Sequence, residues 1–501
     1  MGLVTASRSE ATNGARTGAR RPGSATSEQT LRLASTGGLT AATLCAAVIF
    51  HVAFPKAGFK WRGIPITIPD IVYLLLLVFA FFRFWRPFHM SRSVKVCSLL
   101  MVLGMAYFAF RIWFEQYYGY PAAWADNLAE LTALCIYPLI FFALLFVVDQ
   151  FRLEGVVLRV LRGSVVVVLV YGMAQKILGD YRVVIPGLTA NWDDAHQPDF
   201  LIGKDNMLWG TQTLKLTSTF QNGNILAINL LLLLPLAVAL CRSRRSKITV
   251  AVLGGLELTL AASRSAWAGA AFLALLVLLV NFKRIDQRLA FGVLVAVAAF
   301  VFLFYVPVGR ERFTQTSNEG LMDMGGRMYP ASILVQDSVI DNPDNDVQSV
   351  LWGPFRTTRK RVALSGGEAY EMFYLSLWEI GGVVGVALWL APVAFSMMRF
   401  YRRRSDPVLR AVFLGIAAWS VAAIAEGAFW LPPTSFNLWM LIGLGWLRVT
   451  ARDRLLPRAS AQRLGVKLQD SWLLDLGRAG RSGRLRPLRP ASVHDKSRWL
   501  R

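Results

Sequence analysis

The chain has 501 residues, of which 55% are hydrophobic and 17% charged, and 54 Lys and Arg against 31 Asp and Glu give a net charge of +23. Charged residues fall below the share of about 25% that is usual in soluble domains, and apolar runs recur along most of the length. The composition therefore excludes an ordinary soluble globular protein. The positive charge is spread over short loops next to apolar runs, which is typical of contact with anionic lipid and predicts no nucleic-acid partner.

Twelve apolar segments approach the length of roughly 20 residues that a helix needs to cross a bilayer. They predict an all-α, polytopic integral membrane protein with about 12 transmembrane helices. The apolar run that starts at residue 371 is too long for one straight span, so we expect its first part to lie outside the membrane or at its border. The expected spans are residues 35–54, 66–84, 96–113, 127–148, 160–178, 223–241, 248–262, 266–280, 289–307, 371–399, 408–429 and 435–449.

Lysine and arginine gather in every second short loop between these segments. The basic loops lie at residues 83–95, 152–162, 242–247, 283–288 and 399–404. Because basic loops stay in the cytoplasm, this pattern predicts that both termini lie there and that the loops 179–222 and 308–370 lie on the outer side. We expect a disordered basic N-terminus (1–34), a membrane domain (35–450) and a basic cytoplasmic tail (451–501). The second outer loop is expected to be a large helical periplasmic loop.

The most informative position is Arg264, which lies between two short apolar segments, residues 248–262 and 266–280. Each is barely long enough to cross a bilayer, so together they predict a tight helical hairpin with the arginine at its tip. An arginine at this depth is costly unless it meets an anion or water. Two interpretations stay open: the arginine binds an anion, or it reaches out to the lipid headgroups.

Two further cations, Lys215 and Arg327, lie in the outer loops, against the general preference of cations for the cytoplasmic side. With Arg264 they form a set that suits an anion carried by a lipid, such as a diphosphate, because arginine can donate two parallel hydrogen bonds to phosphate. Taken singly, Lys215 and Arg327 are more simply explained as solvated loop charges. Only the set of three makes an anion site as good an explanation.

Two segments around these cations resemble motifs of a known enzyme family. Residues 215–225 read Lys-Leu-Thr-Ser-Thr-Phe-Gln-Asn-Gly-Asn-Ile, which is similar to an Arg-x-x-Gly-Thr-Phe-x-Asn-Pro-Asn segment that leads into a span, with Lys215 for arginine and Gly223 for proline. Residues 263–267 read Ser-Arg-Ser-Ala-Trp, which is similar to a Ser-Arg-Gly-Ala-Trp hairpin, with Ser265 for glycine.

Two later segments extend the resemblance. Residues 326–327 (Gly-Arg), followed by 341–343 (Asp-Asn-Pro) and 352–355 (Trp-Gly-Pro-Phe), resemble a large outer loop, and residues 374–385 resemble a Leu-x-x-Glu-x-Gly-x-x-Gly entry into the next span. In this order the four segments resemble the O-antigen polymerase and ligase superfamily, integral-membrane enzymes that polymerise or transfer glycans from undecaprenyl diphosphate. The resemblance covers about residues 205–400.

The resemblance implies polymerisation of undecaprenyl-diphosphate-linked oligosaccharide repeat units into a surface polysaccharide or exopolysaccharide, on the outer face of the bacterial inner membrane. It implies that Arg264 and Arg327, as catalytic residues, and Lys215 bind the diphosphate, while Asn224 and Trp352 complete the binding of diphosphate and glycan. It implies neither a metal ion nor a cofactor, and the outer loops carry no Asp-x-Asp or paired-His pattern. The partners it implies are the lipid-linked oligosaccharide, membrane lipids, and a chain-length regulator and a flippase of the same pathway.

One departure from the family concerns the catalytic base. Ligases of the superfamily place a histidine just before the fourth motif, where this chain has Glu368 and Glu371 and no histidine nearby. A carboxylate can accept the proton of an attacking sugar hydroxyl, so Glu368 is the preferred base, with Asp323 and Asp341 as competitors. Glu371 is at least as well explained as an acid favoured by the dipole at a helix start.

Two other functions stay open. A ligase of the same superfamily would transfer finished glycan to a lipid or protein, and the missing histidine argues against it. A transporter or flippase of lipid-linked glycans would place ionisable residues near the middle of several spans, whereas the expected spans are nearly free of charge. We therefore prefer a glycan polymerase.

Overall fold

The structure is a computed structural model of the chain. It describes residues 24–61, 64–83, 90–118, 128, 130–151, 153–179, 182–190, 214–281, 286–289, 292–293, 295, 310, 347–353, 372–427, 429 and 431–463. The chain divides into two compact units, Met1–Leu447 and Arg448–Arg501. The candidate site and the packing described below belong to the first unit.

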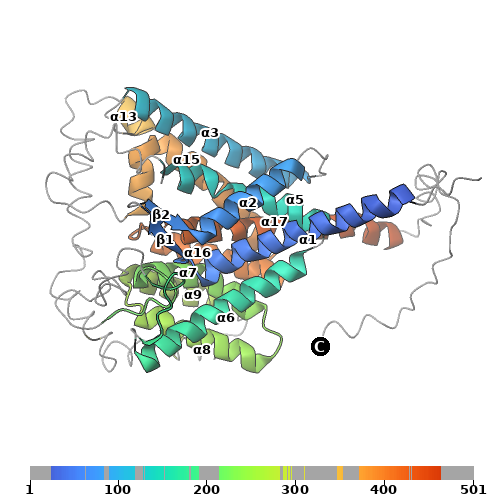
Figure 1. The fold of residues 1–501 in the computed structure, drawn as a ribbon. Coiled ribbons are helices and arrows are strands. Elements are labelled where there is room, and N and C mark those ends of the chain that lie inside the picture. The colour runs from blue at the N-terminus through green and yellow to red at the C-terminus, as the bar shows by residue number, and fades with distance from the viewer. Residues whose placement is uncertain are drawn as a thin grey trace, which may run out of the picture. The chain divides into compact units, whose positions relative to one another are not determined.

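Most of the described residues are helical, in agreement with the prediction of a helical protein. The first group of helices comprises α1 (Ser24–Ala53), α2 (Ile68–Arg83), α3 (Arg92–Tyr118), the short π-helix η1 (Thr132–Ile136), α5 (Leu139–Phe151) and α6 (Glu154–Leu178). The second comprises α7 (Gly223–Ala239), α8 (Arg244–Leu260), α9 (Arg264–Asn281), α13 (Val347–Trp352), α15 (Phe373–Arg402), α16 (Pro407–Ala422) and α17 (Pro432–Arg463). Figure 1 shows their arrangement.

Three described helices are both long and apolar enough to cross a membrane: Arg92–Phe114, Glu154–Leu178 and Phe373–Arg402. Large apolar side chains are exposed along several helices, for example Phe82 on α2 and Phe110 on α3. Apolar surface left facing outward in this way is typical of contact with lipid. Shorter apolar helices lie at Gly38–Ala53, Ile68–Phe82, Thr132–Val148, Gly223–Ala239, Arg264–Val280 and Pro407–Ala422.

The helix bounds differ from the expected spans at several ends, of which three differ by the largest margins. Helix α1 starts before residue 35 and α17 continues beyond residue 449, while α16 ends at Ala422, short of the expected 429. The expected span 289–307 lies largely outside the described residues.

We predicted that the long apolar run from residue 371 would not form one straight helix, and the structure agrees. Helix α15 is interrupted at Gly382, whose φ of 61° and ψ of −166° are not helical. An added Cβ at Gly382 would collide with the carbonyl oxygen of Leu351 in α13. Glycine is therefore required at this kink both for its positive φ and for the close approach of α13.

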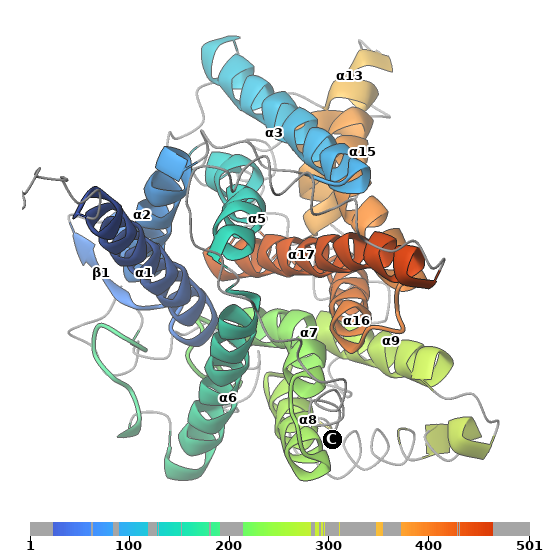
Figure 2. The same ribbon diagram turned by 90° about the vertical axis from the view of Figure 1, so that its right-hand side faces the viewer.

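The best-buried part of the unit forms around α7. Thirteen of its 17 residues are buried, which is typical of a helix surrounded by others. Helices α7 and α9 both pack against α16, and Figure 2 shows the three side by side. Gly415 of α16 lies so close to the carbonyl oxygen of Leu232 that a Cβ would collide with it. Small residues at helix crossings allow this approach.

A β-hairpin between α1 and α2 was not predicted. Its strands β1 (Gly58–Trp61) and β2 (Ile64–Thr67) pair antiparallel. The Gly58 amide donates to the carbonyl oxygen of Gly187 at 3.0 Å, and the Lys56 ammonium donates to that of Thr189 at 3.3 Å. The hairpin thus ties the start of the 179–222 loop to the connection between the first two helices.

Candidate functional site

Arg264 is the first residue of α9, and three residues join it to the end of α8 at Leu260, so the predicted pair of helices with a short turn between them is present. Ala262 in this turn is fully buried and packs against Trp267. The Trp267 indole Nε1–H donates to the carbonyl oxygen of Leu258 at 3.1 Å and ties α9 to the end of α8. The contacts of Ala262 and Trp267 therefore stabilise the turn that precedes Arg264.

The segment that begins at Lys215 packs on this turn. The Leu216 amide donates to the carbonyl oxygen of Leu260 at 3.0 Å. An added Cβ at Gly223 would lie 2.6 Å from the carbonyl oxygen of Ala261 and 3.0 Å from Lys215 Cβ. A side chain at this position would therefore collide with the turn before Arg264. The first two motifs, far apart in the sequence, thus meet in space.

Backbone strain gathers in these same two segments. Among the described residues, Ser218 (φ 49°) and Ala262 (φ 54°) are the non-glycine residues with positive φ. This conformation costs roughly 1–2 kcal/mol per residue, and such strain often marks functional sites. The Ser218 hydroxyl donates to the carbonyl oxygen of Val168 in α6 at 2.8 Å, which holds its turn in place.

The electrostatics of the junction favour an anion. Helices α7 and α9 both begin here, and a helix start carries a partial positive charge of about half a unit. Asn222 caps α7 by accepting the Ile225 amide at 2.9 Å. Lys215 and Arg264 are half-buried at the same junction, and Asn224 lies in the first turn of α7. Two helix starts and two basic side chains are the usual components of a phosphate site.

Glu426 joins this junction, although sequence reasoning missed it. It follows α16, is 6% exposed, and its Oε2 accepts a hydrogen bond from the Ser265 hydroxyl at 3.3 Å. The Ser265 and Ser263 hydroxyls lie 3.0 Å apart. No sequence signal pointed to Glu426, because it lies in the last part of an expected span and its partner is 161 residues away.

Trp352 and Gly353, the described residues of the third motif, lie at the kink of α15, where a Cβ at Gly353 would lie 2.8 Å from the amide nitrogen of Gly382. Trp352 ends α13, is 46% exposed, and its ring centroid lies 6.2 Å from that of Tyr107. The Tyr107 hydroxyl donates to the carbonyl oxygen of Gly381 at 2.7 Å. The exposed face of Trp352 is free to meet a ring-shaped ligand or the membrane border.

The start of α15 packs on the segment that carries Glu426. The Phe373 and Phe429 ring centroids lie 4.5 Å apart, and the Tyr374 hydroxyl donates to the carbonyl oxygen of Ser420 at 2.9 Å. Helix α15 therefore begins beside the Glu426 segment, which contacts the hairpin. Glu368 and Glu371 directly precede this helix in the sequence.

Several predicted residues cannot be placed. Arg327, Glu368, Glu371, Asp323 and Asp341 lie outside the described residues. Of the predicted site residues, the structure brings the segment of Lys215 and Asn224 together with the hairpin of Arg264. Trp352, at the end of α13, lies on the helix that packs against α15 instead.

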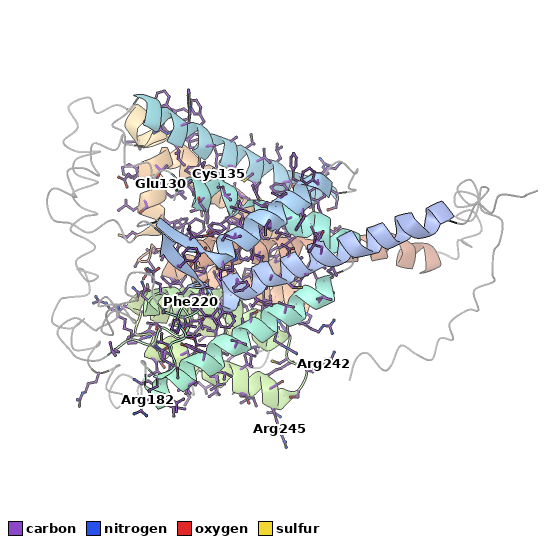
Figure 3. The ribbon with its side chains drawn as sticks, in the orientation of Figure 1. Glu130, Cys135, Arg182, Phe220, Arg242 and Arg245 are labelled. Atoms are coloured by element: carbon purple, nitrogen blue, oxygen red, sulfur yellow. The ribbon has the colours of Figure 1, made fainter. Side chains whose placement is uncertain are left out.

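Helix α8 separates the junction of Lys215 and Arg264 from the basic loop 242–247, which lies at the other end of that helix. In Figure 3, Phe220 of the Lys215 segment and Arg182 lie toward the left, whereas Arg242 and Arg245 lie farther to the right. Helix α8 has 17 residues, which corresponds to about 25 Å of helix. The two ends of the hairpin are thus almost a hydrocarbon thickness apart.

The described helices contain more buried ionisable side chains than we expected. Glu257 and His51 are 0% exposed, Glu379 is 2% and Arg111 is 5%. Helices that we expected to be nearly free of charge therefore carry several buried ionisable side chains. Within the described ranges, no group of three or more His, Cys, Asp or Glu residues could hold a metal ion.

The chain matches no protein-family model, and no curated protein matches it.

Proposed function

We propose that the chain is a metal-independent glycosyltransferase that polymerises undecaprenyl-diphosphate-linked repeat units on the outer face of the bacterial inner membrane. It has about twelve spans, with both termini in the cytoplasm. The observation that carries the proposal is the contact between the Lys215 segment and the Arg264 hairpin, through Leu216 and Leu260. This contact brings together two motifs that the resemblance assigns to diphosphate binding.

In the proposed reaction the junction holds the diphosphate of the donor. Arg264 and Lys215, with the starts of α7 and α9, bind its oxygens, and Arg327 adds a further cation from the outer loop. Preorganised positive groups stabilise the charge that develops as the diphosphate leaves, which is the largest contribution in many enzymes. The contact between the Lys215 segment and the hairpin holds Arg264 and the starts of α7 and α9 near one another before the substrate binds.

The acceptor is a sugar hydroxyl of a second lipid-linked glycan. Its oxygen forms a bond to the anomeric carbon of the donor, the bond from that carbon to the diphosphate breaks, and undecaprenyl diphosphate departs. Glu368 accepts the hydroxyl proton as general base. Asn224 and Trp352 contact the diphosphate and the glycan.

Glu426 positions the hairpin in this scheme. Its carboxylate accepts the Ser265 hydroxyl next to Arg264 and supplies negative charge at the back of a positive site. A buried carboxylate next to cations lowers the free-energy cost of burying those cations when no substrate is bound.

The second candidate is a transporter or flippase of lipid-linked glycans. The buried side chains of Glu257, Glu379 and Arg111 favour it, because ionisable groups inside membrane helices often mark transport pathways. The polymerase is preferred because the two cationic motifs meet at the end of the hairpin and not along its length.

Analysis of surface polysaccharide after deletion of the gene tests the proposal. A polymerase mutant keeps single repeat units and loses long chains. Full-length polymer retained on the lipid carrier would indicate a ligase instead, and repeat units trapped on the cytoplasmic side would indicate a flippase. Either of these results would overturn the proposed polymerase.

A further inference from the structure

Glu257 lies inside the protein at the junction of three segments. It belongs to α8, is 0% exposed, and its Oε1 occupies the space where a side chain at Gly172 of α6 would begin. Gln175, one turn further along α6, donates its Nε2–H to the Thr217 hydroxyl at 3.1 Å. The turn from Thr217 to Phe220 covers the end of α8, because Leu216 bonds to Leu260.

Four buried oxygen atoms on these three segments have no hydrogen-bond partner among the described residues. They are Oε1 and Oε2 of Glu257, Oε1 of Gln175 and Oγ1 of Thr219. A buried polar atom without a partner destabilises the folded protein, and a buried ionised carboxylate does so more strongly. Four such atoms on segments that contact one another therefore suit a ligand that satisfies them together.

We propose that Glu257, Gln175 and Thr219 bind a monovalent metal cation of the Na⁺ type. Hard cations take carboxylate, amide and hydroxyl oxygens as ligands. One carboxylate supplies one negative charge, which neutralises a monovalent ion and would leave a divalent ion with buried excess charge. A proton would satisfy only the carboxyl group, whereas a metal ion coordinates several oxygens at once.

The site lies one helical turn below the hairpin tip. The Ala261 amide donates to the carbonyl oxygen of Glu257 at 2.8 Å, so the turn before Arg264 is built directly on this residue. A bound ion would link α6, α8 and the Thr217 turn and would hold the tip in place. The inference does not rest on the proposed reaction, because ion binding is measured without any glycan.

Retention of ²²Na⁺ by the purified full-length protein in detergent tests the site directly. We expect saturable retention by the wild type, competed by unlabelled Na⁺ and not by choline at equal ionic strength. Glu257→Gln should lower retention to that of a protein-free control. Glu154→Gln, at the opposite end of α6 from Gly172, is the matched control and should retain Na⁺ as the wild type does.

A second measurement keeps the inference testable if Glu257→Gln does not fold. The wild-type thermal midpoint should rise saturably with NaCl and not with choline chloride, since a ligand that binds only the folded state stabilises it. No saturable ²²Na⁺ retention by the wild type would overturn the site. Stable Glu257→Gln protein that retains Na⁺ normally would overturn the assignment of its ligand.

Discussion

The Ser265 hydroxyl donates a hydrogen bond to Oε2 of Glu426 across 161 residues of sequence, at 3.3 Å. This bond joins the residue after Arg264 to the segment that follows α16, and that segment in turn packs against Phe373 at the start of α15. The hairpin tip is therefore held from two sides, by the Lys215 segment and by the Glu426 segment. Both contacts bear on the position of Arg264.

The first prediction concerns the charge of Glu426. Glu426→Gln keeps an oxygen that can accept the Ser265 hydroxyl but removes the negative charge. A hydrogen bond to a charged group contributes about 1.5–3 kcal/mol and a neutral one about 0.5–1.5 kcal/mol, so we expect polymerisation to slow roughly 5- to 10-fold while the protein still accumulates. Ser265→Gly removes this hydrogen bond altogether and should slow polymerisation at least as much. A normal rate in Glu426→Gln would show that the charge has no role.

The second prediction is the topology, which every site argument requires. Because basic loops alternate with the two long loops, we expect residue 332 outside and residue 246 inside. An impermeant thiol reagent applied to intact cells should label Ser332→Cys and should leave Ser246→Cys unlabelled until the cells are opened. The four native cysteines need replacement first, with activity retained as the control. The opposite labelling pattern would remove the proposed site from the outer face.

The third prediction separates a catalytic base from a helix-start acid. A general base contributes typically 100- to 10,000-fold to a rate, whereas an acid at a helix start contributes about 0.3–1 kcal/mol of stability. We expect Glu368→Gln to accumulate stable protein that binds the lipid-linked donor and leaves repeat units unjoined. Glu371→Gln should lose a little thermal stability and keep most activity. If both variants polymerise normally, the base is not in this pair, and Asp323 and Asp341 become the next residues to test.

The fourth prediction concerns pH and stability. Burial lowers the pKa of the Lys56 ammonium from 10.5 to about 7. The unfolded chain then binds this proton more tightly than the folded chain, so the free energy of unfolding rises with pH between these two values. We expect the thermal midpoint of the purified protein to rise from pH 7 to pH 9.5, and Lys56→Met to lose part of that rise. Lys95→Met, an exposed lysine on α3, is the control and should keep it. Identical slopes in all three proteins would contradict the role of Lys56.

Hydropathy predicted the helices and the Arg264 hairpin because length and apolar content decide whether a helix can lie in lipid. The short β-hairpin escaped prediction because its four-residue strands are held by a distant partner, Gly187. The contacts of Glu426 and Glu257 were not predicted for a related reason, because the residues around them come from segments far away in the sequence. A buried carboxylate in an apolar helix leaves no periodic pattern. Loop motifs pointed to Lys215 and Arg264, but only the fold shows that their segments touch.

The fifth prediction tests the arginine at the hairpin tip. Arg264→Lys keeps the positive charge and loses the planar fork that makes two parallel hydrogen bonds to phosphate. Loss of one preorganised donor costs about 100- to 1,000-fold in rate. We therefore expect folded Arg264→Lys protein with little polymerising activity. An arginine that merely reaches the headgroups would tolerate lysine almost freely.

The most direct measurement is polymerisation by purified protein in liposomes supplied with undecaprenyl-diphosphate-linked repeat units, with product length read on a gel. The wild type should convert single repeats into long lipid-linked chains without added metal, and Arg264→Lys should leave them mostly single. Wild-type protein that is folded and binds the donor but leaves every repeat unjoined would contradict the proposed polymerase.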